Sequence, residues 1–323
     1  MVVDTEIKEE IFEAVTRLFG IEIQSWNPIH LGYKNLKWQV KTTAGDLFVK
    51  QYNKQRYPEE RVPGLEKALQ IQNMLYGEGL PCPKLFPYKG NFVLNTENGE
   101  RFVLMGFNKG FTLPPGSANS SQMYSLGKVI GRMHVLLEKN IAREPLHWDL
   151  LSKPEMLENW NERYEEAIAL DCSKTLQNLE IQRRILAEND TSLFTQCDKG
   201  WAHWDLFADN ILFSENGVSS ILDFDRMNVV YTDFDISRPI LSCCVDENRM
   251  NVDGVLAFVS GYREYKALPL EQLITSIKLN WWKEAEWVRV EKPGDSTPLK
   301  RFREENVWIA ENWDCLEDLF SGI

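Results

Sequence analysis

The feature that most constrains this chain is a polar interruption between apolar segments, in the stretch KGWAHWDLFADNILF of residues 199–213. His203, Asp205, Asp209 and Asn210 stand between apolar residues on both sides. Polar side chains between buried segments are costly unless they are hydrogen-bonded or serve a site. The stretch is therefore a candidate functional loop, and the alternative is a buried polar loop whose hydrogen bonds are satisfied.

A second polar residue, Asp223, follows this stretch at a spacing that suits a β-hairpin. The run SILDFD ends a short apolar strand at 219–224, and residues 210–213 form another such strand. The segment SENGV between them is typical of a turn. A strand–turn–strand unit would bring Asn210 and Asp223 to one end of a hairpin. An amide oxygen and a carboxylate are hard ligands that suit Mg²⁺ shared with a phosphate, which leaves Asp205 to accept a proton.

The N-terminal third of the chain has the pattern of a small sheet with helices. Apolar and polar residues alternate in LGYKNLKWQVK and LFVKQY, as in half-buried strands, and the helical stretches carry apolar residues at helical spacing. The predicted elements are a helix over 4–19, a hairpin or meander within 29–52, a helix over 64–76, and strands near 91–95 and 101–106.

A break rich in Gly, Pro, Asn and Ser, NKGFTLPPGSANSS, separates this region from a largely helical one. The predicted helices after it are 121–138, 154–170, 174–188, 254–266, 270–290 and 300–319, and the only strands expected there are 210–213 and 219–224. We expect an α+β, bilobal fold, with a small antiparallel sheet and one main helix in residues 1–108. Residues 109–323 would form a large, mainly helical lobe, with a hinge at about 105–115.

Composition limits the class of protein. The 323 residues are 43% hydrophobic and carry a net charge of −12, so nucleic acid and anionic membranes are poor partners. No apolar run reaches the roughly 18 residues of a membrane span, and no signal-peptide pattern opens the chain. The six cysteines form no C-x-x-C and are expected to be reduced. We expect a cytoplasmic monomer or homodimer that acts on a small molecule.

The polar residues match the template of phosphoryl transfer in protein kinases, H-x-D-x-x-x-x-N followed by a metal-binding Asp. The chain resembles the aminoglycoside phosphotransferase/choline kinase superfamily, the protein-kinase-like kinases of small molecules. The resemblance spans roughly residues 25–240. Its motifs are GYKN, FVKQY, GLPCPKL, LMGFNKGFTL, SLGKVIGRMH, HWDLFADNILF, ILDFD and DFDISR.

This resemblance implies roles for individual residues and makes residues 1–108 a nucleotide-binding lobe. Asp205 would be the catalytic base, and Asn210 and Asp223 would bind Mg²⁺. Lys50 would contact the phosphates of ATP, and Glu66, near the start of the following helix, would fix the position of Lys50. The implied cofactors are ATP and Mg²⁺.

Further roles follow from the same resemblance. Gly32 would lie in the loop that covers the phosphates. The hinge over 105–108, with Met105 and Phe107, would offer backbone N–H and C=O groups to adenine. His203 would organise the catalytic loop without reacting.

Several departures argue against a conventional protein kinase. The sequence has no G-x-G-x-x-G and no A-P-E segment. Asp225 stands where the D-F-G motif has Gly, and it is expected either to contact metal or substrate or to cap local backbone. Trp204 fills a position that is usually small in the family. Asp235 in DFDISRP is expected to be structural, at the start of a helix.

The leading hypothesis is an ATP-dependent phosphotransferase that phosphorylates a hydroxyl of a small molecule. The acidic balance favours an amino-bearing acceptor, such as an aminoglycoside, homoserine or a choline-like compound. The alternative is a non-catalytic binding or structural protein on the same fold, like the spore-coat relatives. Lys50, Asp205, Asn210 and Asp223 are all present, which favours the enzyme. A metallohydrolase that uses His203 and Asp205 ranks last, because the further His ligands of such a site are missing.

A group of tryptophans near the C-terminus has two interpretations. Aromatic cages bind quaternary ammonium groups, but aromatic residues at helical spacing belong more often to the core, which is the interpretation we favour. The residues are Trp281, Trp282, Trp287, Trp308 and Trp313.

Overall fold

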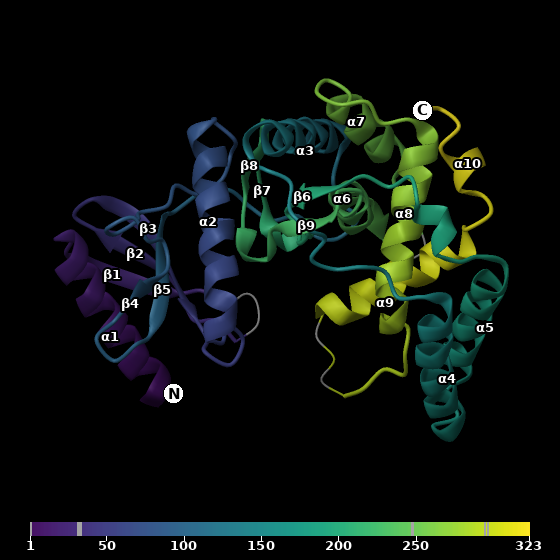
Figure 1. The fold of residues 1–323 in the computed structure, drawn as a ribbon, viewed down its shortest axis with the longest axis horizontal. Coiled ribbons are helices and arrows are strands. Elements are labelled where there is room, and N and C mark those ends of the chain that lie inside the picture. The colour runs from purple at the N-terminus through teal and green to yellow at the C-terminus, as the bar shows by residue number, and fades with distance from the viewer. Residues whose placement is uncertain (1, 31–33, 247–248, 294, 296) are drawn as a thin grey trace. The chain divides into compact units, whose positions relative to one another are not determined.

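The computed structural model describes residues 2–30, 34–246, 249–293, 295 and 297–323 (Figure 1). Gly32, the predicted phosphate-loop glycine, lies outside the described residues. The chain folds into two compact units. The first comprises Met1–Gly110 with Ser219–Arg226, and the second comprises Phe111–Val218 with Met227–Ile323. No helix among the described residues is long and apolar enough to cross a membrane.

The first unit contains a five-stranded antiparallel sheet in the order β1-β2-β3-β5-β4. Its strands are β1 (Ile23–Pro28), β2 (Lys37–Thr42), β3 (Gly45–Tyr52), β4 (Leu94–Asn95) and β5 (Arg101–Gly106). In the register of β2 and β3, Lys37 lies directly opposite Lys50. The central strands β3 and β5 are largely buried, because both faces of the sheet are covered.

Two helices cover the two faces of this sheet (Figure 1). α1 (Val2–Phe19) packs Ile11 and Val15 against residues such as Val49 on one face. α2 (Val62–Gly77) follows the short helix η1 (Glu59–Arg61) and packs Leu65 and Leu69 on the other face. Successive strand residues point to opposite faces, so neighbouring residues of one strand belong to different cores.

A segment distant in the sequence completes the first unit. The Ile221 N–H donates to the carbonyl of Pro81 (2.8 Å), and Asn108 Nδ2 donates to Ser220 Oγ (2.8 Å). The short helix η4 (Phe224–Arg226) packs against α2. The prediction that residues 109–323 form one lobe is therefore wrong for 219–226. These residues belong with the first unit because their hydrogen bonds and charges are satisfied there.

The second unit is mainly helical. Its α-helices are α3 (Ser120–Asn140), α4 (Lys153–Ala169), α5 (Ser173–Glu188), α6 (Phe234–Cys244), α7 (Val252–Tyr262), α8 (Leu270–Glu284), α9 (Thr297–Glu311) and α10 (Leu316–Leu319). Its short helices are η2 (Thr191–Phe194), η3 (Ala208–Asn210) and η5 (Ala285–Trp287). Its strands are β6 (Lys199–Ala202), β7 (Ile211–Ser214), β9 (Asn228–Tyr231), β10 (Val245–Asp246) and β11 (Arg249–Met250), and β8 (Gly217–Ile221) crosses the boundary of the units.

The closest helix packing in the second unit depends on glycine. A Cβ on Gly127 of α3 would lie 2.0 Å from the carbonyl oxygen of Phe258 in α7. A Cβ on Gly261 of α7 would lie 2.1 Å from the carbonyl oxygen of Tyr124 in α3. Only glycine allows the two backbones to approach this closely. The contact fixes α3, which carries the buried His134.

Most predicted helices are confirmed, but the expectation of only two strands after residue 109 is wrong. β6 and β9 pair in an antiparallel sheet, and each has only four residues, too few for a clear alternation. Only the start of α6 is predicted, through the helix start expected at Asp235. Pro239, a residue that normally interrupts a helix, lies inside it, and all eleven of its residues are buried, including Asp235 and Arg238. The predicted strand–turn–strand unit is present as β7, a turn and β8.

Candidate active site

The predicted site residues are divided between the two units. Lys50, Glu66, Met105, Phe107, Asp223 and Asp225 belong to the first unit, and His203, Asp205 and Asn210 belong to the second. Asn210 and Asp223 therefore belong to different units, and their predicted proximity stays a prediction.

In the first unit, Lys50 lies between two carboxylates. It is placed by β3, and its side chain is 3% exposed. Its Nζ lies 2.7 Å from Asp223 Oδ1 and 2.5 Å from Asp225 Oδ2. The structure thus brings together the predicted phosphate ligand, a predicted metal ligand and the residue whose role the sequence left open.

Asp225 is the most enclosed member of this cluster. Tyr52 Oη donates to its Oδ1 (3.0 Å), and Tyr57 Oη donates to its Oδ2 (3.0 Å). Its side chain is 2% exposed, compared with 24% for Asp223. The sequence left two roles open for Asp225, a contact with metal or substrate and a cap of local backbone. These hydrogen bonds do not support the backbone cap, because all of their donors are side chains.

Charge pairing decides the protonation of the cluster. Burial opposes the charge of Asp223, but Lys50 and Lys37 outweigh it and hold the pKa of Asp223 well below its ordinary value. Burial likewise opposes the charge of Lys50, and the two carboxylates outweigh it and raise the pKa of Lys50. Burial raises the pKa of Asp225, in spite of Lys50. Lys50 and Asp223 therefore form a stable ion pair at neutral pH.

Lys37 is a member of this site that the sequence prediction missed. The strand alternation assigned it to the polar face, together with Gln39 and Lys41. The structure pairs it with Lys50 across β2 and β3, where burial and then the charge of Lys50 lower the pKa of Lys37. Like charges directly opposite each other destabilise a sheet, and the charges of Asp223 and Asp225 oppose this effect at Lys37. The signal was the cross-strand register, which a single sequence does not contain.

The predicted ion pair of Lys50 with Glu66 is corrected by the structure. The carboxylate of Glu66 accepts hydrogen bonds from the backbone N–H groups of Phe92 (2.8 Å) and Val93 (2.8 Å). Glu66 thereby satisfies the backbone of the turn before β4, while Lys50 is bound by the two aspartates. Glu59, another acid near the start of α2, forms an ion pair with Arg101.

The predicted hinge has fewer free backbone groups than expected. Met105 is buried in β5, and Phe107 is half-buried just after it. The N–H of Gly106 donates to the carbonyl of Lys84 (2.8 Å), and the N–H of Phe107 donates to the carbonyl of Asp46 (3.2 Å). Adenine recognition by these two N–H groups would need those bonds to break, so the adenine-binding role of the hinge remains a prediction.

In the second unit, Asp205 and Asn210 form one compact hydrogen-bonded loop between β6 and β7. Asn210 Nδ2 donates to the carbonyl oxygen of Asp205 (2.8 Å) and to its Oδ2 (3.1 Å). Asp205 is half-buried. The asparagine therefore fixes both the backbone and the carboxylate of the predicted base. Asp209 points elsewhere, with a side chain that is 55% exposed and forms an ion pair with Arg301.

Asp235, in the first turn of α6, anchors this loop. It is fully buried and accepts hydrogen bonds from the backbone N–H groups of His203 (2.6 Å) and Trp204 (2.8 Å). His134 of α3 lies 3.4 Å from the same carboxylate. His203 is fully buried, and its Nδ1 accepts the N–H of Asp205 (3.3 Å). His203 therefore contacts the loop from within, and its role as an organising residue stays a prediction.

Both parts of the candidate site contain strained backbone. Trp204, next to Asp205, has φ of 64°, and Asp223 has φ of 62°. A left-handed conformation costs about 1–3 kcal/mol for residues other than glycine, and it persists where the surrounding structure enforces it. At Trp204 the enforcing contact is the carboxylate of Asp235.

With this geometry established, comparison with known proteins identifies the family. The model of the family described as "Phosphotransferase enzyme family" matches residues 25–268. The chain belongs to this family.

The curated relatives include several homoserine kinases. That of Gluconobacter oxydans (strain 621H) is 25% identical over 273 residues, covering 83% of this chain and 82% of the relative. That of Zymomonas mobilis subsp. mobilis (strain ATCC 31821 / ZM4 / CP4) is 25% identical over 290 residues, covering 86% and 84%.

Solved structures give the same fold. A microcompartment-associated aminopropanol kinase matches with a TM-score of 0.64 and 15% identity, over 96% of this chain and 98% of that one. Amicoumacin kinase hAmiN, in complex with AMP-PNP, Ca²⁺ and Ami, matches with a TM-score of 0.60 and 15% identity, over 97% of each chain. The α+β kinase-like fold predicted from the sequence is thereby confirmed.

Asp223 and Asn210 of this phosphotransferase each carry an oxygen of the kind that binds a hard divalent cation. Asp223 is ionised and is partly exposed, as a carboxylate ligand must be. In Asn210, Nδ2 is the atom that holds Asp205, so the amide oxygen Oδ1 can serve as a ligand. Carboxylate and amide oxygens are the ligands that Mg²⁺ takes beside phosphate oxygens and water.

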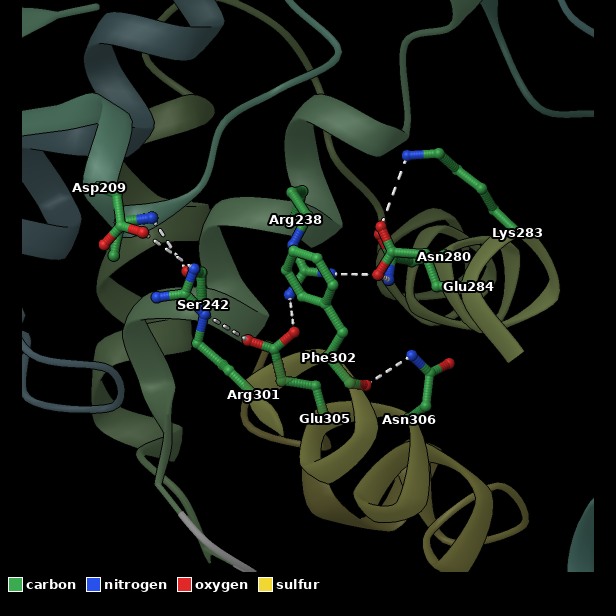
Figure 2. A network of polar contacts seen from close by, with 11 residues as sticks. Asp209, Arg238, Ser242, Asn280, Lys283, Glu284, Arg301, Phe302, Glu305 and Asn306 are labelled. Carbon is green, nitrogen blue, oxygen red and sulfur yellow. Dashed lines mark hydrogen bonds and ion pairs between the residues drawn. The ribbon is translucent and has the colours of Figure 1, made fainter. Parts of the chain in front are cut away.

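A buried charge network of the phosphotransferase adjoins the loop that carries Asp205. Figure 2 shows Arg238 of α6 with Glu284 of α8 and Glu305 of α9, to both of which its guanidinium is bonded. The same guanidinium lies 4.7 Å from the ring centroid of Phe207 in the loop. Arg238 is 2% exposed, so breaking this network would leave charges buried without partners. The network links three helices to the segment that carries Asp205.

The tryptophan group of the phosphotransferase belongs to the core. Trp281, Trp282, Trp308 and Trp313 are each at most 4% exposed, and Trp281 and Trp313 pack edge to face at 5.2 Å. Side chains so deeply buried are not open to a solute ligand. Trp287 is half-buried and lies 6.2 Å from Phe302.

Proposed function

We propose that this phosphotransferase transfers the γ-phosphoryl group of ATP to a hydroxyl of a small amino-bearing molecule, with Mg²⁺. The observation that carries the proposal is the pair of hydrogen bonds from Asn210 to Asp205. They hold the candidate base and a candidate metal ligand together in one loop, as in the kinase template, where one loop carries both residues.

The proposed roles divide the chemistry among the chain's own residues. Asp205 accepts the proton of the acceptor hydroxyl while the oxygen of that hydroxyl attacks the γ-phosphorus. The bond between this phosphorus and the oxygen that bridges it to the β-phosphorus breaks, which releases ADP. Lys50 remains charged and neutralises phosphate oxygens. Asn210 and Asp223 would hold Mg²⁺, which supplies charge neutralisation on the phosphates when bound.

Three observations support an amino-bearing acceptor. Homoserine and aminopropanol, named in the descriptions of relatives, each carry an amine and a hydroxyl. Spectinomycin phosphotransferase, another structural neighbour, is named for an antibiotic substrate and matches with a TM-score of 0.56. The net charge of −12 favours cationic over anionic small molecules.

The non-catalytic alternative is not favoured. A binding protein would not need Lys50 to stay ionised between two acids, nor Asp205 to be fixed by Asn210. We also propose a cytoplasmic location, for which the six free cysteines are suitable.

The test is a coupled ADP-release screen over hydroxylated amines, amino acids and sugars, with the Asp205→Asn variant beside the wild type. The wild type should release ADP with an amino-bearing acceptor, and the variant should be slower by about 10²–10⁴-fold. Both proteins should be stabilised against heating by ATP and Mg²⁺, since Asp205 is not assigned to nucleotide binding.

Two results would contradict the proposal. An Asp205→Asn variant with the wild-type rate would exclude Asp205 as the base. Absence of both ADP release and nucleotide stabilisation in the wild type would favour the binding protein.

A further inference from the structure

The acid that accompanies Lys50 is not the one that the kinase template supplies. In that template the lysine pairs with a glutamate on the helix after its strand. Here the corresponding Glu66 is bound to the backbone N–H groups of Phe92 and Val93. Lys50 needs another fixed partner, because its Nζ is almost fully removed from water.

Asp225 has the surroundings of a fixed partner. Its two carboxylate oxygens accept three hydrogen bonds, one from Lys50 and one each from the hydroxyls of Tyr52 and Tyr57. Tyr52 is fully buried and Tyr57 is 8% exposed, and their rings pack edge to face at 5.0 Å. A carboxylate with these donors has little freedom to turn toward a ligand.

Asp223 differs from Asp225 in its exposure to solvent. It shares Lys50 with Asp225, but its side chain is twelve times as exposed, 24% against 2%. If Asp223 is engaged as a metal ligand, as the proposed function has it, Asp225 is the acid that stays with Lys50. The two aspartates of D-F-D then have separate tasks, one toward the ligand and one toward the protein.

We propose that Asp225, held by the hydroxyls of Tyr52 and Tyr57, is the positioning residue for Lys50 and takes the place of the helix glutamate. The consequence for catalysis rests on the proposed function, whereas the pairing itself can be tested without nucleotide or metal. Asp225→Asn keeps the shape of the side chain but removes the charge that holds Lys50.

The first experiment measures the accessibility of Lys50 in the full-length protein without ligands. A brief pulse of acetic anhydride at one fixed pH is followed by peptide mass spectrometry. In Asp225→Asn the acetylation of Lys50 should rise about tenfold, because a lysine released from its partner opens more often to solvent. In Glu66→Gln it should stay at the wild-type level.

Glu100→Gln is the matched control, because Glu100 forms an ion pair with Lys54, 2.8 Å away, and not with Lys50. It should change the labelling of Lys54 only. Tyr57→Phe should raise the labelling of Lys50 by less than Asp225→Asn does, and it keeps the test decisive if the aspartate variant fails to fold. Unchanged Lys50 labelling in Asp225→Asn and Tyr57→Phe, or increased labelling in Glu66→Gln, would overturn the proposal.

The second experiment separates positioning from metal binding by steady-state kinetics. Asp225→Asn should lower kcat/KM for ATP by about tenfold or more, with the KM for the acceptor and the Mg²⁺ requirement unchanged. An increased Mg²⁺ requirement with unchanged Lys50 labelling would make Asp225 a metal ligand and overturn the proposal. If the wild type shows no kinase activity, the proposed function fails while the labelling still decides the pairing.

Discussion

Two sets of buried aspartates, one in each unit, are held in different ways. In the first unit, Asp223 and Asp225 share the cation Lys50. In the second, Asp235 accepts the backbone N–H groups of His203 and Trp204, with His134 at 3.4 Å. Asp233, its neighbour in sequence, accepts the N–H of Asp198 (3.1 Å) and the amide of Gln272 (3.4 Å).

The difference shows what each arrangement provides. Asp223 is partly exposed, and the charges of Lys50 and Lys37 outweigh burial and keep its pKa low, whereas burial raises the pKa of the more enclosed Asp225 in spite of Lys50. Burial among neutral donors raises the pKa of Asp233 to about 6. Neutral donors do, however, let a carboxylate fix a backbone conformation, as Asp235 does for the loop that carries Asp205. The first arrangement therefore maintains a charged pair of Lys50 and Asp223, and the second holds a backbone conformation.

The largest effect should come from removing the shared cation. Lys50→Met would leave two buried carboxylates without it, and we expect the free energy of unfolding to fall by about 3–5 kcal/mol at pH 7. The loss should be smaller at pH 5, because a carboxyl group that takes up a proton no longer needs a cation. Urea denaturation at the two pH values measures both effects.

Lys54→Met is the matched control for this prediction. Lys54 lies just beyond the same strand and pairs with Glu100, but its side chain is 47% exposed. Its replacement should change the free energy of unfolding by less than about 1 kcal/mol. Equal losses in the two variants would mean that the Lys50 cluster is held by packing and not by charge.

A smaller loss of stability, with a distinct effect on activity, should follow Asp235→Asn. The variant replaces a charged acceptor of two backbone N–H groups with an amide that has one acceptor oxygen. We expect the free energy of unfolding to fall by about 2–4 kcal/mol. Amide hydrogen exchange at His203 and Trp204 should accelerate, and turnover should fall while nucleotide stabilisation persists.

Asp209→Asn is the control, since Asp209 lies in the same loop but is 55% exposed. It should alter stability by less than about 1 kcal/mol. Protected amides at His203 and Trp204 in Asp235→Asn would show that the loop does not depend on the carboxylate.

The sequence alone was enough to predict those helices and strands that have a local pattern of apolar residues. The amphipathic helices α1, α2 and α3 have regular apolar spacing and terminal signals, such as the capping box of Asn119 and Gln122. The four-residue strands β6 and β9 have no such pattern, because their pairing depends on partners about 30 residues away. The extent of α6 has no clear sequence signal, because the helix contains Pro239 and buries its polar residues together with its apolar ones.

The candidate site divides along the same line. Asp205 and Asn210 are five residues apart, and the motif that contains them is sufficient to predict that they act together. The partner of Lys50 was assigned incorrectly because Glu66 and Asp225 both satisfy the charge requirement. Which acid reaches the lysine depends on contacts across more than 170 residues and on the competing amides of Phe92 and Val93.

The smallest predicted effect concerns Asp233, a carboxylate with no cation in hydrogen-bonding contact. The unfolded chain releases its proton near pH 4, whereas burial lets the folded protein keep it until about pH 6. The folded state therefore binds more protons in this window, so the free energy of unfolding falls as the pH rises through it.

Asp233→Asn lacks this proton, and Gln272 can turn its amide oxygen toward the new amide group. From pH 4 to pH 7 the variant should gain about 2–3 kcal/mol relative to the wild type. Asp209→Asn, whose side chain is 55% exposed, should run parallel to the wild type in the same series of urea denaturations. Parallel curves for Asp233→Asn as well would mean that Asp233 is already ionised at pH 4 and that its neutral donors hold charge as well as Lys50 does.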